Sequence, residues 1–305
     1  MLTRQILFGL FAALLLAALP STAKAQDKLP VVATFSILGD LVSNVGGDRV
    51  AVKSLVGPNG DAHVYSPSPA DARTLADAKL IVTNGLGFEG WLTRLVKSSN
   101  SKARNVVASK GVKPRKLAGK HAHDHGHGPS DGDPHAWQSV ANAKTYVANI
   151  RDGLIAADPA GKAVYEANAA AYLDKLEALD REIRETIAKI PPERRRIITT
   201  HDAFGYFSDA YGVEFVAPQG VSTESEASAR DVARIITQIK KQKIPAVFLE
   251  NISNPRLLKQ IADETGAKVG GTLYSDALTD EKGPAPTYID LIRHNIRTLS
   301  AALQS

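Results

Sequence analysis

The stretch from Ala160 to Ile190 constrains the fold most, because it predicts one unusually long helix. It contains no proline and a single glycine. Its apolar residues recur in steps of three and four, the period of a helix, at Tyr172, Leu176, Leu179, Ile183, Ile187 and Ile190. Pro191-Pro192 ends the pattern, since proline cannot continue a helix. A helix of about 28 residues would be roughly 42 Å long, longer than a small domain is wide.

Short apolar runs alternate with helical patterns on both sides of this stretch. Four strands are predicted before it and four after it: Val31–Phe35, Val50–Val56, Leu80–Thr83, Asn105–Val107, Arg196–Thr200, Val213–Val216, Ala246–Leu249 and Lys268–Val269. Helices are predicted between them at Leu38–Val45, Pro69–Ala78, Trp91–Lys97, Ala229–Gln242 and Pro255–Thr265. Such alternation is typical of mostly parallel sheets flanked by helices. We therefore expect an α/β protein of two lobes joined by a single long rigid helix, rather than one large sheet with another core helix.

The first 25 residues have the pattern of a secretory signal peptide. Arg4 provides the basic start, residues 6–19 form an apolar run, and Ala23-Lys24-Ala25 is a small-x-small cleavage site. An uncleaved anchor is the alternative, but the run is shorter than the roughly 20 residues of a membrane span. No cysteine is available for lipidation. We expect a periplasmic protein with four parts: signal peptide 1–25, N-terminal lobe 26–157, connecting helix 158–190 and C-terminal lobe 191–305.

Composition excludes several classes of function. Hydrophobic residues make up 44% and charged residues 23% of the chain, as in ordinary soluble proteins. The formal net charge of +5 falls to +3 without the signal peptide and is spread along the chain, so no nucleic-acid partner is indicated. The chain has no cysteine, and its one methionine is the initiator. Iron–sulfur, Cu(I) and thiolate zinc sites are therefore excluded.

Histidines gather in one low-complexity segment. Five of the eight lie within fifteen positions: His121, His123, His125, His127 and His135. The segment 113–134 lacks apolar periodicity and is predicted to be a surface loop. Histidine-rich tracts are typical of metal capture. We expect the first four histidines to bind additional metal weakly, with a functionally neutral insertion as the alternative.

Four potential ligands stand at comparable points of the predicted lobes. His63, His201 and Asp276 follow predicted strands, and His135 follows the loop and precedes a helix. Ligands of open α/β sheets bind beyond the carboxyl ends of the strands, so these side chains are expected to converge between the lobes. The positive helix starts after His135 and His201 would favour neutral imidazole, the form that binds metal. His294, in the amphipathic C-terminal segment, is expected to take no part.

Several sequence blocks, in this order, resemble the zinc- and manganese-specific solute-binding proteins of ABC importers (cluster A-I, zinc-binding branch). They are Gly60–Pro69, Asn84–Trp91, the histidine-rich loop, Asp133–Trp137, Thr200–Phe207 and Ser275–Ala277. The resemblance implies two α/β lobes joined by one long helix, with one metal ion at their interface. Its ligands would be His63, His135, His201 and Asp276. The implied partner is a membrane permease, with a periplasmic zinc chaperone as a further candidate, and the protein is expected to be a monomer.

Three glutamates are candidate hydrogen-bond partners of the ligating histidines. Glu224, Glu226 and Glu250 are candidates to accept the second N–H of ligating imidazoles, and a solvent-exposed or helix-capping role is the alternative for each.

Three imidazoles and one carboxylate suit Zn²⁺, because Mn²⁺ prefers more oxygen ligands. In the resembling family, manganese-handling members tend to carry a carboxylate at the position of His201. Zinc is therefore the expected substrate and manganese the alternative.

Two other classes of protein are alternatives. A zinc hydrolase would keep one open coordination position for water, whereas four protein ligands would fill a tetrahedron. The chain also has no His-Glu-x-x-His motif. A metal-dependent surface adhesin is disfavoured by the missing lipidation cysteine. We therefore expect a non-enzymatic, high-affinity zinc-binding protein.

Overall fold

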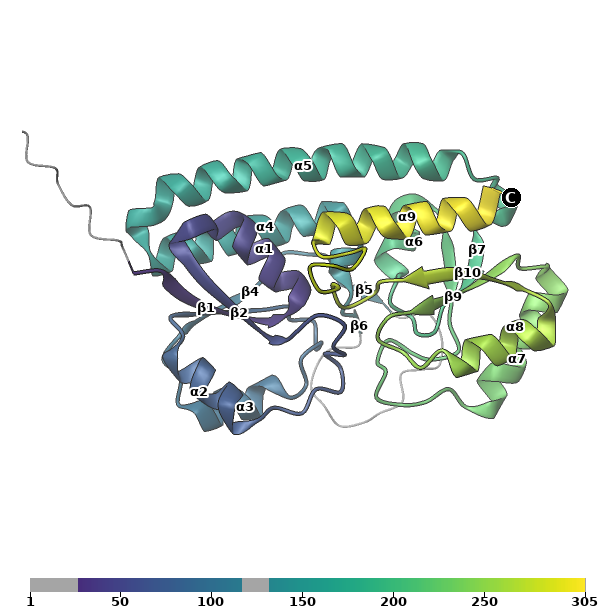
Figure 1. The fold of residues 1–305 in the computed structure, drawn as a ribbon, viewed down its shortest axis with the longest axis horizontal. Coiled ribbons are helices and arrows are strands. Elements are labelled where there is room, and N and C mark those ends of the chain that lie inside the picture. The colour runs from purple at the N-terminus through teal and green to yellow at the C-terminus, as the bar shows by residue number, and fades with distance from the viewer. Residues whose placement is uncertain (1–26, 117–131, 305) are drawn as a thin grey trace, which may run out of the picture.

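The computed structural model describes residues 27–116 and 132–304. Two lobes lie side by side, and each has one sheet with helices on both faces (Figure 1). A long helix runs along the top of both lobes. This arrangement confirms the predicted fold class. The predicted signal peptide and the tract of His121, His123, His125 and His127 lie outside the described residues.

The N-terminal lobe is built on a four-stranded parallel sheet with the strand order β2-β1-β3-β4. Its strands are β1 (Leu29–Phe35), β2 (Val50–Val56), β3 (Leu80–Thr83) and β4 (Arg104–Val107). Its helices are α1 (Ser36–Gly46), α2 (Pro69–Asp77), α3 (Leu92–Ser99) and α4 (Val140–Ala157). Every residue of the inner strand β3 is buried, because helices cover both faces of the sheet.

The C-terminal lobe repeats this plan with the strand order β10-β9-β7-β8, again parallel. Its strands are β7 (Arg196–Ile198), β8 (Glu214–Val216), β9 (Ala246–Glu250) and β10 (Lys268–Leu273). Its helices are α6 (Gly205–Tyr211), α7 (Ala229–Gln242), α8 (Arg256–Thr265) and α9 (Tyr288–Gln304). All eight predicted strands are present. The helix expected directly after His201 begins four residues later, at Gly205 of α6. The sequence did not predict the small antiparallel hairpin of β5 (Arg115–Lys116) and β6 (Gly132–Asp133).

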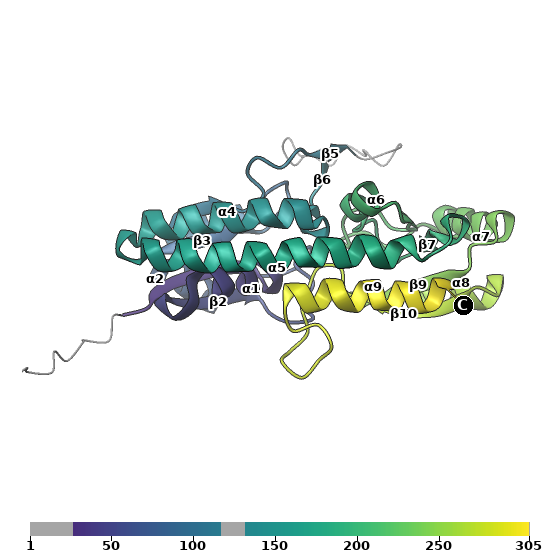
Figure 2. The ribbon, with the colours of Figure 1, turned by 90° about the horizontal axis from the view of Figure 1, so that it is seen from above.

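Helix α5 (Lys162–Ala188) connects the lobes. Its 27 residues make it about 40 Å long, and it buries one stripe: Tyr165, Ala169, Tyr172, Leu176, Leu179, Ile183 and Ile187. Helix α9 lies beside it in both views (Figures 1 and 2), and Arg293 of α9 pairs with Glu182 at 2.8 Å. Like the other helices of the described residues, α5 is not apolar enough to cross a membrane.

The interface between the lobes is packed and hydrogen-bonded. One continuous hydrophobic cluster contains residues of both sheets, including Phe35 and Leu273. Trp137, fully buried, donates from Nε1 to the Ser275 carbonyl oxygen at 3.0 Å, and its own carbonyl accepts from the Tyr288 hydroxyl at 2.6 Å. The lobes therefore share a core instead of meeting across a flexible hinge.

We expect only small lobe motions when metal leaves. A continuous helix has no loop residues that can absorb large backbone rotations, and opening the shared core would expose buried apolar surface. Small-angle scattering of the metal-free and metal-loaded protein should give nearly equal radii of gyration. A change of several ångströms would contradict this expectation.

Candidate metal site

The chain brings the four predicted ligands to one place between the lobes. His63, His201 and Asp276 lie just beyond the carboxyl ends of β2, β7 and β10, and His135 lies just beyond β6. Two of them sit in the same kind of turn. Asp61 Oδ1 accepts the backbone N–H of His63, and Asp133 Oδ1 accepts that of His135, each at 2.9 Å.

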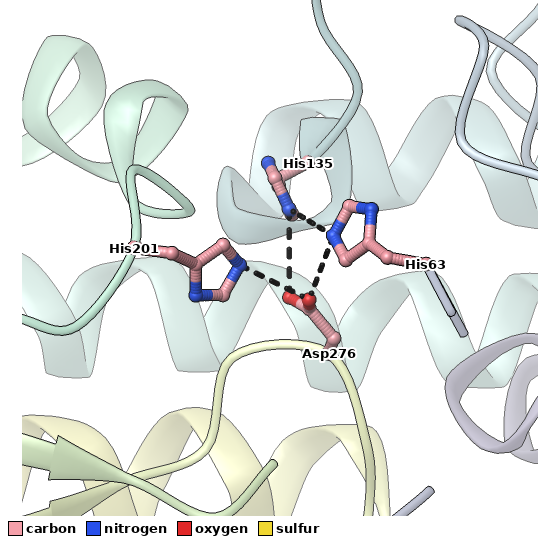
Figure 3. A group of neighbouring side chains, drawn as sticks. All are labelled: His63, His135, His201 and Asp276. Atoms are coloured by element: carbon pink, nitrogen blue, oxygen red, sulfur yellow. Dashed lines mark hydrogen bonds and ion pairs between the residues drawn. The ribbon is translucent and has the colours of Figure 1, made fainter. Parts of the chain in front are cut away.

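The four side chains point toward a common centre (Figure 3). His63 Nε2 lies 3.2 Å from His135 Nε2 and 3.2 Å from Asp276 Oδ2. His201 Nε2 lies 3.2 Å from Asp276 Oδ2, and His135 Nε2 lies 3.7 Å from Asp276 Oδ1. One ligand atom from each residue can be chosen so that all lie within 4.8 Å of one another.

These distances are those of a metal coordination shell. Bonds of about 2.05 Å in a tetrahedron separate neighbouring ligand atoms by about 3.3 Å. Two Nε2 atoms in contact also cannot both donate a hydrogen bond to each other. His201 Nε2 and both carboxylate oxygens of Asp276 are buried without a hydrogen bond of good geometry among the described residues. A cation at the centre would satisfy these atoms.

Buried carboxylates hold two of the imidazoles from behind. Asp133 Oδ1 lies 2.8 Å from His135 Nδ1, and Glu250 Oε2 lies 2.5 Å from His201 Nδ1. Each pair directs Nε2 toward the centre and orients the ring. Asp133 was missed by sequence reasoning, although its position two residues before a candidate ligand was a usable signal.

The predicted acidic neighbours differ in their placement. Glu250 is buried and also accepts the backbone N–H groups of Thr200 and His201 through Oε1, at 2.7 and 3.0 Å. Glu224 and Glu226 are exposed, and no ion pair joins either of them to an imidazole among the described residues. Their predicted contact with ligating imidazoles is therefore wrong.

The carboxylates also decide the charge of the imidazoles. Burial alone would lower the pKa of His135, but Asp276 and Asp133 raise it to about 9. Burial is likewise outweighed at His201, where Glu250 and Asp276 raise the pKa well above its usual range. Burial lowers the pKa of His63. The expectation that helix starts keep His135 and His201 neutral is thus wrong for the metal-free site, and an arriving metal ion must displace protons.

Replacing Glu250 with glutamine should weaken metal binding by about 10- to 100-fold. The amide nitrogen would face His201 Nδ1 as a donor, which moves the imidazole proton to Nε2 and blocks coordination. Competition with a chromophoric chelator measures the dissociation constant. Glu264→Gln, an exposed change on α8 of the same lobe, is the matched control. Equal dissociation constants for the two variants would show that Glu250 does not support the site.

Comparison with known protein families gives one match over most of the chain. The family described as "Zinc-uptake complex component A periplasmic" matches residues 31–302. The iron-binding protein YfeA of Yersinia pestis is 36% identical over 302 residues, which cover 96% of this chain and 94% of that protein. The manganese-binding lipoprotein MntA of Halalkalibacterium halodurans is 35% identical over 283 residues, covering 92% and 91%.

Solved structures give the same result. The periplasmic zinc binding protein TroA of Treponema pallidum superposes with a TM-score of 0.84 at 33% identity, over 92% of this chain and 100% of that chain. A Mn-bound periplasmic metal binding protein of Candidatus Liberibacter asiaticus gives a TM-score of 0.80 at 32% identity, over 91% and 100%. The metals in these names differ, so similarity alone leaves the choice of metal open.

Proposed function

This chain belongs to the family of periplasmic zinc-uptake components, the metal-binding proteins of ABC importers, and we propose that its substrate is Zn²⁺. The family consists of solute-binding proteins and not of enzymes, so the hydrolase alternative falls away. The proposal names His63, His135, His201 and Asp276 as the ligands. The protein would hand the ion to a membrane permease.

One observation carries the choice of zinc: three imidazole nitrogens and a single carboxylate form the centre. Zn²⁺ is stable with four ligands in a tetrahedron and binds nitrogen well. Mn²⁺ prefers oxygen ligands and lies lower in the Irving–Williams order. The close spacing of the four groups favours a compact four-coordinate ion.

Manganese is the second candidate, and a specific feature of the site favours it. Both oxygens of Asp276 face imidazoles, Oδ1 toward His135 and Oδ2 toward His63 and His201. A bidentate carboxylate would raise the coordination number to five, which Mn²⁺ accepts more readily. Several relatives are named for manganese, such as the substrate-binding lipoprotein PsaA of Streptococcus pneumoniae.

Two measurements test the assignment. Mass spectrometry of protein purified without a histidine tag should find one tightly held zinc ion for each chain. Competition calorimetry should show that Zn²⁺ displaces Mn²⁺ from this site. Displacement of bound Zn²⁺ by equimolar Mn²⁺ would overturn the zinc proposal in favour of manganese.

The location and partners belong to the same proposal. The relatives MntA and PsaA are named as lipoproteins, whereas this chain has no cysteine to carry a lipid. We infer a monomer that is released into the periplasm after cleavage near Ala25. A periplasmic zinc chaperone is a further candidate partner. Detection of Gln26 as the first residue of protein isolated from the periplasmic fraction would support this location, and an intact N-terminus in the membrane fraction would refute it.

The histidine tract is proposed to collect metal and not to hold it. Its four histidines alternate with small and polar residues, so metal binding must offset the conformational entropy that such a sequence loses when its side chains gather around one ion. Deleting Ala118–His127 should lower the number of bound zinc ions while the tightest site persists, as calorimetry would show. A variant of equal length with serines at the four histidines is the control for loop length. Unchanged stoichiometry and transfer in both variants would favour a neutral insertion.

A further inference from the structure

The four candidate ligands are not restrained equally. The side chains of His135, His201 and Asp276 are fully buried, whereas that of His63 is 4% exposed. Buried carboxylates hold His135 and His201 at Nδ1. No hydrogen bond or ion pair to His63 Nδ1 is found within residues 27–116 and 132–304. Its ring instead packs edge-to-face with Phe88, with 4.7 Å between the ring centroids.

Hydrogen bonds to the backbone hold the turn that carries His63, and one of them is linked to the opposite lobe. Within the N-terminal lobe, Trp91 Nε1 donates to the carbonyl oxygen of Ala62 at 2.8 Å. Asp61 Oδ1 accepts the His63 N–H at 2.9 Å. Asp61 Oδ2 accepts the hydroxyl of Thr223, from the C-terminal lobe, at 2.6 Å. One carboxylate therefore links the turn that carries His63 to a loop of the other lobe.

That loop is itself bonded to the turn that carries His201. The Gln219 N–H donates to the Thr200 carbonyl oxygen at 3.3 Å, and the Asp202 N–H donates to the Gly220 carbonyl oxygen at 3.1 Å. The bonded residues Thr200 and Asp202 flank His201. Through Thr223, a single hydroxyl thus joins the supports of two ligands that come from different lobes.

A polar cavity of about 420 Å³ adjoins this bond. Asp61 and Thr223, the two partners of this bond, form part of its wall together with Thr200, which precedes His201 in the chain. Glu226 adds an exposed carboxylate. A hydrated cation can occupy such a volume, since one water takes about 30 Å³. The hydrogen bond between Asp61 and Thr223 therefore lies at the wall of this cavity.

We propose that the hydrogen bond between Thr223 and Asp61 is a latch that holds His63 in place, and that metal enters and leaves when this bond opens. Asp61 and Thr223 are positioning residues that act through His63. The proposal rests on the assigned metal site and adds a route and an order: His63 releases the ion first, while His135 and His201 remain held by their carboxylates. Breaking the latch lowers the barrier in both directions, so association and dissociation accelerate together.

Stopped-flow measurement of zinc release into excess chelator, and of zinc uptake, tests the latch. Thr223→Val removes the hydroxyl at nearly constant volume and should raise both rates roughly three- to tenfold, the range expected for one hydrogen bond, with a smaller change in affinity. Thr223→Ser keeps the hydroxyl and should behave as wild type. Ser222→Ala removes a hydroxyl that accepts the Glu224 N–H within the loop and has no other hydrogen bond among the described residues, and it is the matched control. Thermal melting confirms that each variant is folded, and Thr223→Ala serves as a second test of the missing hydroxyl.

A double-mutant cycle with His63→Ala shows whether the latch acts through this ligand. Thr223→Val should change the release rate little in the His63→Ala background. The latch is refuted if Thr223→Val leaves the rates unchanged, if Thr223→Ser or Ser222→Ala accelerates them equally, or if the two effects are additive. A wild-type protein that fails to bind zinc tightly but binds Mn²⁺ would refute the zinc proposal alone, and the same rates would then be measured with Mn²⁺.

Discussion

Replacing His63, His135 or His201 with alanine is expected to weaken zinc binding by at least about a hundredfold in each case. Each change removes one of the four proposed bonds to the ion. It also leaves Asp276, which is fully buried beside all three imidazoles, without part of its compensating charge. Chelator competition on tag-free protein measures the loss.

His294→Ala is the matched control. His294 lies in α9, where its Nε2 is 3.0 Å from the carbonyl oxygen of Thr272, and it contacts none of the candidate ligands. Its removal should leave zinc affinity unchanged. An unaltered titration curve for any of the three ligand variants would exclude that histidine from the site.

Replacing His201 with glutamate is expected to shift selectivity from Zn²⁺ toward Mn²⁺. The effect should appear mainly in the ratio of the affinities for the two metals. The centre would then offer two nitrogens and two carboxylates, a set closer to the preference of Mn²⁺ for oxygen. Competition calorimetry with both metals measures this ratio.

Glu250 decides how well this substitution is tolerated. Its carboxylate lies behind His201, so a second carboxylate there would place two buried anions side by side. We expect His201→Glu alone to lose stability in the metal-free form, and His201→Glu with Glu250→Gln to recover it while keeping the shifted selectivity. An unchanged affinity ratio in both variants would mean that this position does not set the choice of metal.

The alternation of strands and helices and the long helix could be predicted from the sequence, because both depend on local periodicity. The predicted strand Val50–Val56 and helix Ala229–Gln242 agree with the structure to the residue. The stripe of apolar residues in α5 shows the same period that predicted it. The family resemblance is confirmed as well. The four candidate ligands could be named because strand ends, and for His135 the start of a helix after the histidine-rich loop, are local features. Their role as ligands stays a prediction that the variants above test.

Only the tertiary structure decided what surrounds these four groups. Glu224, Glu226 and Glu250 looked alike in the sequence, yet only Glu250 is buried behind an imidazole, because it ends an inner strand while the other two lie in an exposed loop. The raised pKa of His135 arises from its neighbour Asp133 and also from Asp276, which is far away in the chain. The bond between Asp61 and Thr223 spans 162 positions. Periodicity specifies the elements of each lobe, whereas burial, charge and contact between the lobes depend on distances that exist only after the two sheets have packed under α5.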